Sequence, residues 1–205
     1  MPDINLVIEG KTDEYVMLAL FKYLNLQEPR IRLNRQNARG GEKEAIITSL
    51  PKWNEAAKWD YWVVVIDMDN DSNCVAEYRK KLLPVLSGNM IFRIAVRKIE
   101  SWILADSESL AKYFGVSKLL IPTNPENILD PKEEIIKIAR KSKRKDIRED
   151  IVPVEGSGTK QGKGYPHRIQ EFLTHPEYPW RPAVAQESAD SLKRCIRALK
   201  RIKQS

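Results

Sequence analysis

Three aspartates at the end of an apolar run are the residues whose types and spacing most clearly suggest chemistry. The stretch 61–71 reads Tyr-Trp-Val-Val-Val-Ile-Asp-Met-Asp-Asn-Asp. Its uninterrupted apolar part predicts a strand buried on both faces, as in a parallel sheet covered by helices. Ligand sites in open α/β sheets lie at the carboxyl ends of the strands. We therefore expect Asp67, Asp69 and Asp71 at such an edge.

The Asp67-x-Asp69 spacing suits a hard divalent cation. Side chains two residues apart on an extended segment point in the same direction, so both carboxylates can converge on one ion. Two carboxylates with several positions left for water suit Mg²⁺ (or Mn²⁺) beside a phosphate. The alternative is a strand that ends in an acidic, solvated turn, and this stretch alone favours neither interpretation.

A second predicted strand, residues 4–8, also ends at an acid, Glu9. Gly10 allows the backbone to turn sharply, and Thr12 or Asp13 can cap the helix that follows. If the two strands are neighbours, Glu9 lies on the same edge as the Asp-x-Asp pair. A glutamate and two aspartates arranged in this way across a parallel sheet can hold Mg²⁺.

These motifs resemble a known domain. The order strand, Glu9-Gly10-x-x-Asp13, helix, then strand and Asp67-x-Asp69 is similar to the TOPRIM domain of topoisomerases, primases and OLD-type nucleases. The segment 94–106 resembles a family of uncharacterised prokaryotic TOPRIM-like proteins, some of them encoded beside ATPases in defence-type gene clusters. The resemblance covers residues 1–115 well and the rest of the chain only loosely.

The TOPRIM resemblance implies roles for five acids. Glu9, Asp67 and Asp69 are expected to be catalytic and to bind Mg²⁺ or Mn²⁺, with Asp71 and Glu100 as further metal ligands. Glu9 can alternatively act as a general base or acid. Glu100 also has a local explanation, because the helix dipole favours an acid in the first turn of a helix.

The pattern of elements predicts an α/β fold. Alternation of strands and helices predicts a parallel sheet of about four strands with right-handed crossovers. We expect a Rossmann-like TOPRIM core over residues 1–115 and a basic, mainly helical extension over 116–205, packed on the core. The expected strands are 3–8, 30–34, 61–67 and 90–96, and the expected helices of the core are 12–25, 42–58 and 72–86.

Several expectations concern parts of the chain outside the acidic motifs. Trp53 and Trp59 are expected to pack on the core, and Asp106 to cap a helix that ends at Phe114. Prolines 122, 125 and 131 indicate a linker or insertion over 115–131. Further helices are expected at 132–149, 167–174 and 187–203.

Composition limits the classes of protein that the chain can represent. With 205 residues, 42% of them apolar, the chain can bury one core. No apolar run is long enough to span a membrane, and the N-terminus lacks the features of a signal peptide. Cys74 and Cys195 lack metal-site spacing, so a reduced, cytoplasmic setting is expected. Two histidines are too few for a His-rich metal site.

The basic residues are concentrated in the C-terminal third. Residues 132–205 carry 18 Lys/Arg and 10 Asp/Glu, a net charge of +8, whereas residues 1–131 carry 17 and 18, a net charge of −1. This excess favours a DNA or RNA partner, although basic helices are often only solvated faces. The residues expected to contact nucleic acid are Lys11, Arg39, Arg140, Lys141, Lys143, Arg144, Lys145, Lys160 and Lys163.

Two glycine-containing segments are candidate phosphate-binding loops. Gly156–Gly164 does not have P-loop spacing, because only three residues separate Gly158 from Gly162 and a glycine follows Lys163. It is interpreted either as a plain loop or as a mobile loop that carries two lysines toward a phosphate. The segment 35–43, with Arg35, Arg39, Lys43 and two glycines, is interpreted either as a phosphate-binding loop or as a plain flexible connection.

Three functions from different classes remain. The leading one is a Mg²⁺-dependent nuclease. A phage-defence context for it is implied only by the resemblance. The second is a nucleic-acid-binding or effector subunit that acts only with a partner such as an ATPase. The third, an enzyme acting on a small nucleotide, is disfavoured by the large basic excess. A complete topoisomerase or primase is disfavoured because 205 residues are too few for the additional modules of those enzymes.

Overall fold

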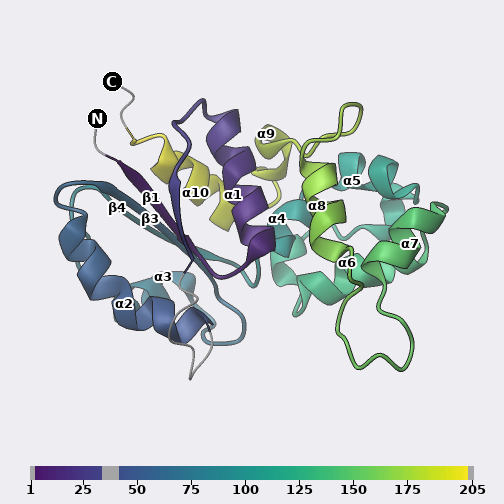
Figure 1. Cartoon of the computed structure of the whole chain (residues 1–205), viewed down its shortest axis with the longest axis horizontal. Coiled ribbons are helices and arrows are strands. Elements are labelled where there is room, and N and C mark those ends of the chain that lie inside the picture. The colour runs from purple at the N-terminus through teal and green to yellow at the C-terminus, as the bar shows by residue number, and fades with distance from the viewer. Residues whose placement is uncertain (1–2, 34–41, 203–205) are drawn as a thin grey trace.

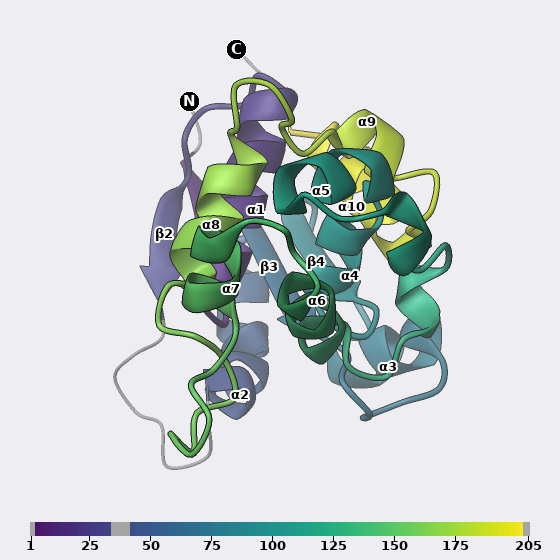
Figure 2. The same cartoon turned by 90° about the vertical axis from the view of Figure 1, so that its right-hand side faces the viewer.

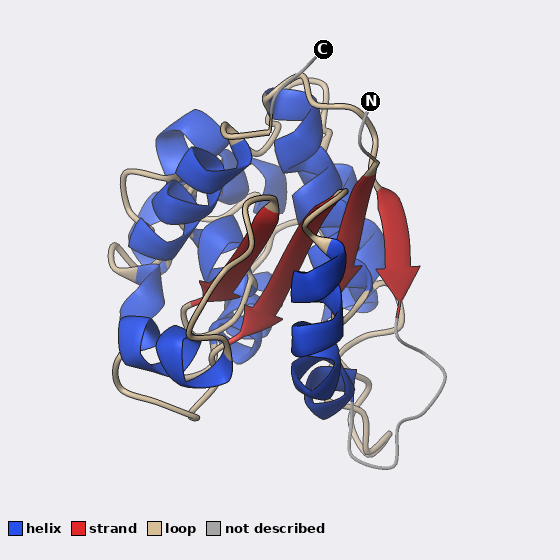
Figure 3. Cartoon of the chain, turned by 90° about the vertical axis from the view of Figure 1, so that its left-hand side faces the viewer, coloured by secondary structure: helices blue, strands red, loops and turns tan. Residues whose placement is uncertain are grey.

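Four parallel strands form the sheet at the centre of the molecule. The computed structural model describes residues 3–33 and 42–202. Its strands are β1 (Ile4–Ile8), β2 (Arg30–Leu33), β3 (Tyr61–Asp67) and β4 (Met90–Ala95), and their order is β2-β1-β3-β4 (Figures 1 and 3). All three pairings are parallel. The predicted α/β class and the four-stranded parallel sheet are therefore confirmed.

The strand register brings the acidic strand ends together. Val7 of β1 pairs with Val64 of β3, so Glu9, two residues further on, comes level with the end of β3. Asp67 pairs with Ala95 of β4, which brings the segment after β4 to the same edge. β1 and β3 are neighbours, so the condition under which Glu9 and Asp67 share one edge is fulfilled.

Helices cover both faces of the sheet. On one face α1 (Lys11–Tyr23) buries Val16 and Met17 against Leu6 and Ile8. On the other face, α2 (Glu42–Ala56) and α3 (Val75–Leu82) pack in a cluster that includes Val7, whose neighbours in sequence face the opposite way. Figure 1 shows α2 and α3 on the side of the sheet away from α1. This alternation along β1 explains why the strand is apolar throughout.

The C-terminal part is helical and shares the core of the sheet. After α4 (Glu100–Leu104) and α5 (Ser107–Phe114) come two short 3₁₀ helices, η1 (Lys118–Leu120) and η2 (Pro125–Asn127). The remaining helices are α6 (Pro131–Arg140), α7 (Lys145–Ile151), α8 (Tyr165–Leu173), α9 (Pro182–Ala185) and α10 (Asp190–Leu199) (Figure 2). One hydrophobic cluster extends from β1 through α10, and Trp102 Nε1 donates to Ser191 Oγ over 2.7 Å. The basic extension is thus built on the same core as the sheet.

The predicted single helix over 132–149 is wrong, because α6 and α7 are separated by residues 141–144. Ser142 is buried and its hydroxyl donates to the carbonyl of Phe114. The same hydroxyl accepts from the amide of Arg144 over 3.0 Å. A serine that binds nearby backbone in this way competes with helical hydrogen bonds, so the chain turns between the two helices.

Other predicted boundaries also change. The helix expected over 72–86 is only α3, because the Ser72 hydroxyl forms a turn with the amide of Cys74 and Pro84 disfavours helix at Leu83. The final helix is α10, shorter than the expected 187–203. The segment 115–131 is more than a linker, because Glu126 accepts from the amides of Asp190 and Ser191 at the start of α10.

The two tryptophans of the second helical segment differ. Trp53 is partly buried and stacks on Trp62, with ring centroids 5.8 Å apart. Trp59 is 80% exposed, so the expectation that it packs on the core is wrong. Asp106 caps α5, as expected, by accepting from the amide of Ser109. None of the helices within residues 3–33 and 42–202 combines the length and the apolar character of a membrane span.

Candidate functional site: a carboxylate pocket

A pocket of about 340 Å³ opens at the carboxyl ends of the strands. Five acids line it, and four of them are among the acids predicted from the sequence. The chain thus brings together Glu9, Asp13, Asp67, Asp69 and Glu100. Lys11, Lys98 and Lys132 line the same pocket. We call this site the carboxylate pocket.

Glu9 and Asp67 are held by backbone amides at the strand ends. Glu9 Oε1 accepts from the amide of Asp67 over 2.7 Å, which fixes the glutamate across the gap between β1 and β3. Asp67 Oδ1 accepts from the amide of Ile99 over 2.9 Å, which joins β3 to the start of α4. Each of these bonds uses one carboxylate oxygen and orients the side chain toward the pocket.

The charge of Asp67 is strongly disfavoured in this environment. Burial raises the pKa of Asp67 well above its usual value, and the negative charges of Asp13, Glu100 and Glu9 raise it further. Like charges that share a poorly solvated site cannot all be ionised without cost. The pocket therefore favours either protons or a cation.

Asp13 belongs to this site, although the sequence suggested only a capping role. The helix begins at Lys11, and Asp13 Oδ2 accepts from the amide of Gly10 over 2.6 Å. Burial, and then the charges of Glu100 and Glu9, raise the pKa of Asp13 to about 8. A helix that starts directly after the end of β1 necessarily places its first turn at the pocket, and this was the signal available in the sequence.

Glu100 is the most deeply placed acid and connects the two parts of the chain. It is 4% exposed, and burial raises its pKa. Tyr165 of α8 donates its hydroxyl to Glu100 Oε1 over 3.3 Å. Lys132 of α6 lies 4.0 Å from the same oxygen and 5.1 Å from the centre of the Tyr165 ring. The C-terminal helices thus form one wall of the carboxylate pocket.

Asp71 does not line the carboxylate pocket. Asp69 has a left-handed φ of 49°, so the alternation of an extended strand stops after Asp67. Asp71 lies 2.6 Å from Lys43 Nζ and accepts from the hydroxyl of Tyr78 over 2.7 Å. The bond from Lys43 lowers the pKa of Asp71. The expectation that all three aspartates share one site is met by Asp67 and Asp69 alone.

Asp69 lies between the pocket and this lysine. Lys43 Nζ is 2.9 Å from Asp69 Oδ2, and Lys98 Nζ is 3.9 Å from Asp69 Oδ1. Both lysines offset the negative charge of Asp69. Asp13 and Asp67, by contrast, lie near other acids that raise their pKa values.

The fit of a metal ion can be judged from the donor atoms. In the part of the chain that the structure describes, no three acidic, histidine or cysteine side chains lie close enough together to form a ready metal site. The chemistry of the donors nevertheless suits a hard cation, because all five acids offer carboxylate oxygens. Binding of Mg²⁺ or Mn²⁺ would then require the carboxylates to rotate toward the ion.

The residues expected to contact nucleic acid occupy different environments. Lys11 lines the carboxylate pocket and lies 2.8 Å from Glu14. Lys145 lies 3.5 Å from Glu149 on the surface of α7. Arg39 lies outside the described residues. The others that are exposed to solvent are Arg140, Lys141, Lys143, Lys160 and Lys163.

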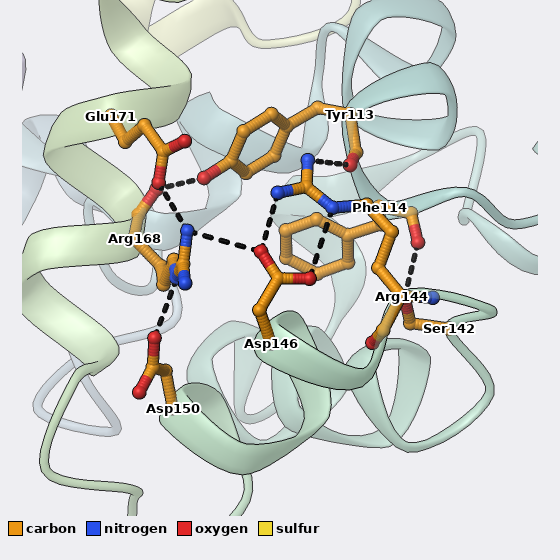
Figure 4. Close-up of polar contacts among 8 residues, drawn as sticks. All are labelled: Tyr113, Phe114, Ser142, Arg144, Asp146, Asp150, Arg168 and Glu171. Atoms are coloured by element: carbon orange, nitrogen blue, oxygen red, sulfur yellow. Dashed lines mark hydrogen bonds and ion pairs between the residues drawn. The ribbon is translucent and has the colours of Figure 1, made fainter.

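Arg144 has an internal role that its basic neighbours lack. Its guanidinium lies 2.5 Å from Asp146 and donates to the backbone carbonyl of Tyr113 over 3.1 Å (Figure 4). The same group lies over the aromatic ring of Tyr113, 5.1 Å from the ring centre. Asp146 in turn lies 3.2 Å from Arg168. Arg144 therefore joins α5 to α7 and is engaged by the protein itself.

The glycine-containing loop contributes to the pocket through Gln161. The amides of Gly162 and Gly164 donate to the carbonyls of Ile151 and Asp150 over 2.9 and 3.0 Å. A Cβ atom on Gly162 would lie only 2.2 Å from the Asp150 carbonyl oxygen. Close approach of two backbones thus explains this glycine, and it positions Gln161 between the exposed Lys160 and Lys163.

No protein-family model, curated protein or solved structure matches the chain. The similarity to TOPRIM domains therefore remains a resemblance carried by the motifs around Glu9 and Asp67.

Proposed function

We propose that this protein hydrolyses phosphodiester bonds in nucleic acid, with Mg²⁺ or Mn²⁺ held in the carboxylate pocket. The observation that carries the proposal is the gathering of Glu9, Asp13, Asp67 and Glu100 at the carboxyl end of a parallel sheet. Their mutual repulsion raises the pKa of Asp13 and of Asp67 beyond the effect of burial. A divalent cation would relieve that repulsion.

The acids would divide between holding the ion and moving a proton. Asp67 and Glu9, each fixed by a backbone amide, are the proposed metal ligands, with Asp69 and Glu100 beside them. A bound Mg²⁺ would lower the pKa of a water molecule and neutralise charge on the scissile phosphate. Asp13, whose pKa is about 8 without a metal ion, would have its pKa lowered by a bound cation and would then be suited to accept a proton near neutral pH.

Lysines in the pocket supply the complementary charge for a phosphate. Lys11, Lys98 and Lys132 line the site together with the acids. Lys132 is also fixed by its contacts with Glu100 and Tyr165. An ammonium group in this position can hold a phosphate oxygen as a point charge.

A nucleic acid is proposed as the substrate because of the basic excess outside the pocket. The net charge of +8 over residues 132–205 exceeds what a small nucleotide needs. Exposed Lys160 and Lys163 flank Gln161, which itself lines the site. The loop can therefore contact the backbone of a strand whose scissile phosphate lies in the carboxylate pocket.

The test is cleavage of single- and double-stranded DNA and RNA with Mg²⁺, Mn²⁺ or EDTA. Asp67→Asn and Glu9→Gln should each lower the metal-dependent rate by about 100-fold or more. Asp71→Asn is the matched control, because it makes the same substitution on the far side of Asp69 and should keep most of the activity. Undiminished cleavage by both pocket variants would refute the proposal.

A second candidate is a nucleic-acid-binding or effector subunit that acts only with a partner such as an ATPase. It is favoured by the observation that the described acids do not form a ready metal site, because a partner could complete one. The resemblance to proteins of defence-type gene clusters suggests the ATPase. This candidate predicts nucleic-acid binding without cleavage by the isolated protein, and robust cleavage by the isolated chain would exclude it.

A further inference from the structure

A second pocket lies at the edge of the sheet and is lined by three arginines. It has a volume of about 100 Å³ and is formed by α3, β4 and α10. Strand β4 is the last strand of the described sheet and lies between those two helices (Figure 2). Arg79 comes from α3, Arg93 from β4 and Arg194 from α10. We call this site the arginine pocket.

Two of these arginines each have one guanidinium nitrogen without a partner in the described part of the chain. Arg79 Nη1 and Arg93 Nε are buried and have no hydrogen-bond partner within the described residues. Over the same residues, no carboxylate forms an ion pair with Arg79 or Arg93, whereas Arg194 pairs with Asp190 over 2.6 Å. A buried charged donor without an acceptor is costly, so its presence requires an explanation.

Positive charge accumulates around this pocket. Burial lowers the pKa of Arg93, and the nearby charges of Arg79, Arg201 and Arg197 lower it further. The arginines thus repel one another and share few acceptors. A bound anion would accept hydrogen bonds from the arginines and would also reduce the repulsion among them.

The shape of the site narrows the class of anion. Its three arginines come from three separate elements, so positive charge reaches the cavity from more than one side. A tetrahedral phosphate has acceptors on all sides and matches guanidinium groups in pairs. A cavity of about 100 Å³ has room for several water molecules or an oxyanion.

We propose that the arginine pocket binds a phosphate group through Arg79 and Arg93, with Arg194 at its rim. The pocket has no lining residue in common with the carboxylate pocket. It is therefore a second phosphate site, independent of any metal. The phosphate comes either from a free ion or nucleotide, or from the backbone of a bound strand.

Phosphate binding is tested by calorimetry and by thermal unfolding in EDTA, with sodium phosphate compared to sodium chloride at equal ionic strength. Phosphate should raise the Tm of the unmodified protein more than it raises that of Arg79→Gln or Arg93→Gln, because the general salting-out effect of phosphate acts on all three proteins alike. Arg79→Gln and Arg93→Gln should each weaken phosphate binding by about tenfold or more. Arg30→Gln, at an exposed arginine on β2, is the control and should bind as the unmodified protein does.

Two results would overturn the proposal. One is a Tm of the unmodified protein that is no higher in phosphate than in chloride. The other is equal phosphate affinity in Arg79→Gln, Arg93→Gln and the unmodified protein. Because Arg79 and Arg93 lie on different elements, either variant suffices if the other fails to fold. Asp67→Asn should bind phosphate normally in EDTA, so failure here is distinguishable from failure of the proposed nuclease activity.

Competition separates the two sources of the phosphate. Displacement of bound phosphate by a short oligonucleotide, together with weaker oligonucleotide binding by Arg79→Gln, would assign the site to a nucleic-acid backbone. Displacement by a nucleoside monophosphate but not by the oligonucleotide would assign it to a free ligand. Either result supports a phosphate site.

Discussion

The carboxylate pocket and the arginine pocket concentrate opposite charges at two borders of one sheet. The first lies at the carboxyl ends of β1 and β3, and the second lies along the outer edge of β4. The two pockets differ in how the repulsion between their like charges can be reduced when no ligand is bound. A carboxylate can take up a proton, and Asp13 does so with a pKa of about 8. A guanidinium stays charged at ordinary pH, so the arginine pocket depends on water or an anion.

The comparison predicts that removing charge stabilises the ligand-free protein at both sites. It also predicts different pH dependence, because protons can relieve only the acids. The three predictions that follow run from the largest expected effect to the smallest.

Asp13→Asn should stabilise the metal-free protein at pH 8.5 and much less at pH 5. Between 3.8 and about 8 the folded protein holds the Asp13 proton and the unfolded chain does not. The stability contributed by this group is therefore complete below the lower value and is lost as the pH rises toward the upper one. We expect a gain of about 2–5 kcal/mol at pH 8.5 in EDTA, measured by urea unfolding. An equal effect at both pH values would contradict the raised pKa of Asp13, which burial and the neighbouring acids cause together.

Gly162→Ala should destabilise the loop that carries Gln161 to the carboxylate pocket. The added Cβ would lie 2.2 Å from the Asp150 carbonyl oxygen, so the backbone must move. We expect a loss of about 1–3 kcal/mol in unfolding free energy. Gly88→Ala is the control, because no atom lies within 4 Å of a Cβ at that position. Phosphate binding in the arginine pocket should persist, and its loss would show that the two pockets are coupled.

Arg93→Met should raise the unfolding free energy by about 1 kcal/mol in chloride, because it removes an unsatisfied buried donor and repulsion among arginines. In saturating phosphate the gain should shrink or reverse, since the variant cannot bind the anion as well. Chemical denaturation in the two salts measures both values. A destabilisation that is the same in chloride and phosphate would assign Arg93 a purely structural role.

The acidic strand ends were accessible to sequence reasoning because the information is local. The apolar run before Asp67 predicted β3 with the bounds that the structure has, Tyr61–Asp67. A parallel sheet brings Glu9 to the same edge as Asp67 only if β1 and β3 are neighbours, and the structure shows that they are. Asp13 was missed because a capping role explains it locally, and its charge becomes significant only when Glu100 and Glu9 lie close to it.

Other features depended on backbone conformation or on long-range packing. The left-handed φ of Asp69 sends Asp71 toward Lys43, and an alternating pattern does not foresee it. The internal contacts of Arg144 require α5 and α7 to be adjacent. The arginine pocket unites side chains from positions 79, 93 and 194, which share no motif in the sequence.

The most direct test of the account is a calorimetric titration of Mn²⁺ into the metal-free protein at pH 8. Asp67→Asn and Asp71→Asn would be titrated beside the unmodified protein. The account predicts saturable binding to the unmodified protein and to Asp71→Asn, and binding at least about tenfold weaker to Asp67→Asn. Identical binding by all three proteins, or no saturable binding by any of them, would contradict the claim that the carboxylate pocket holds a divalent cation.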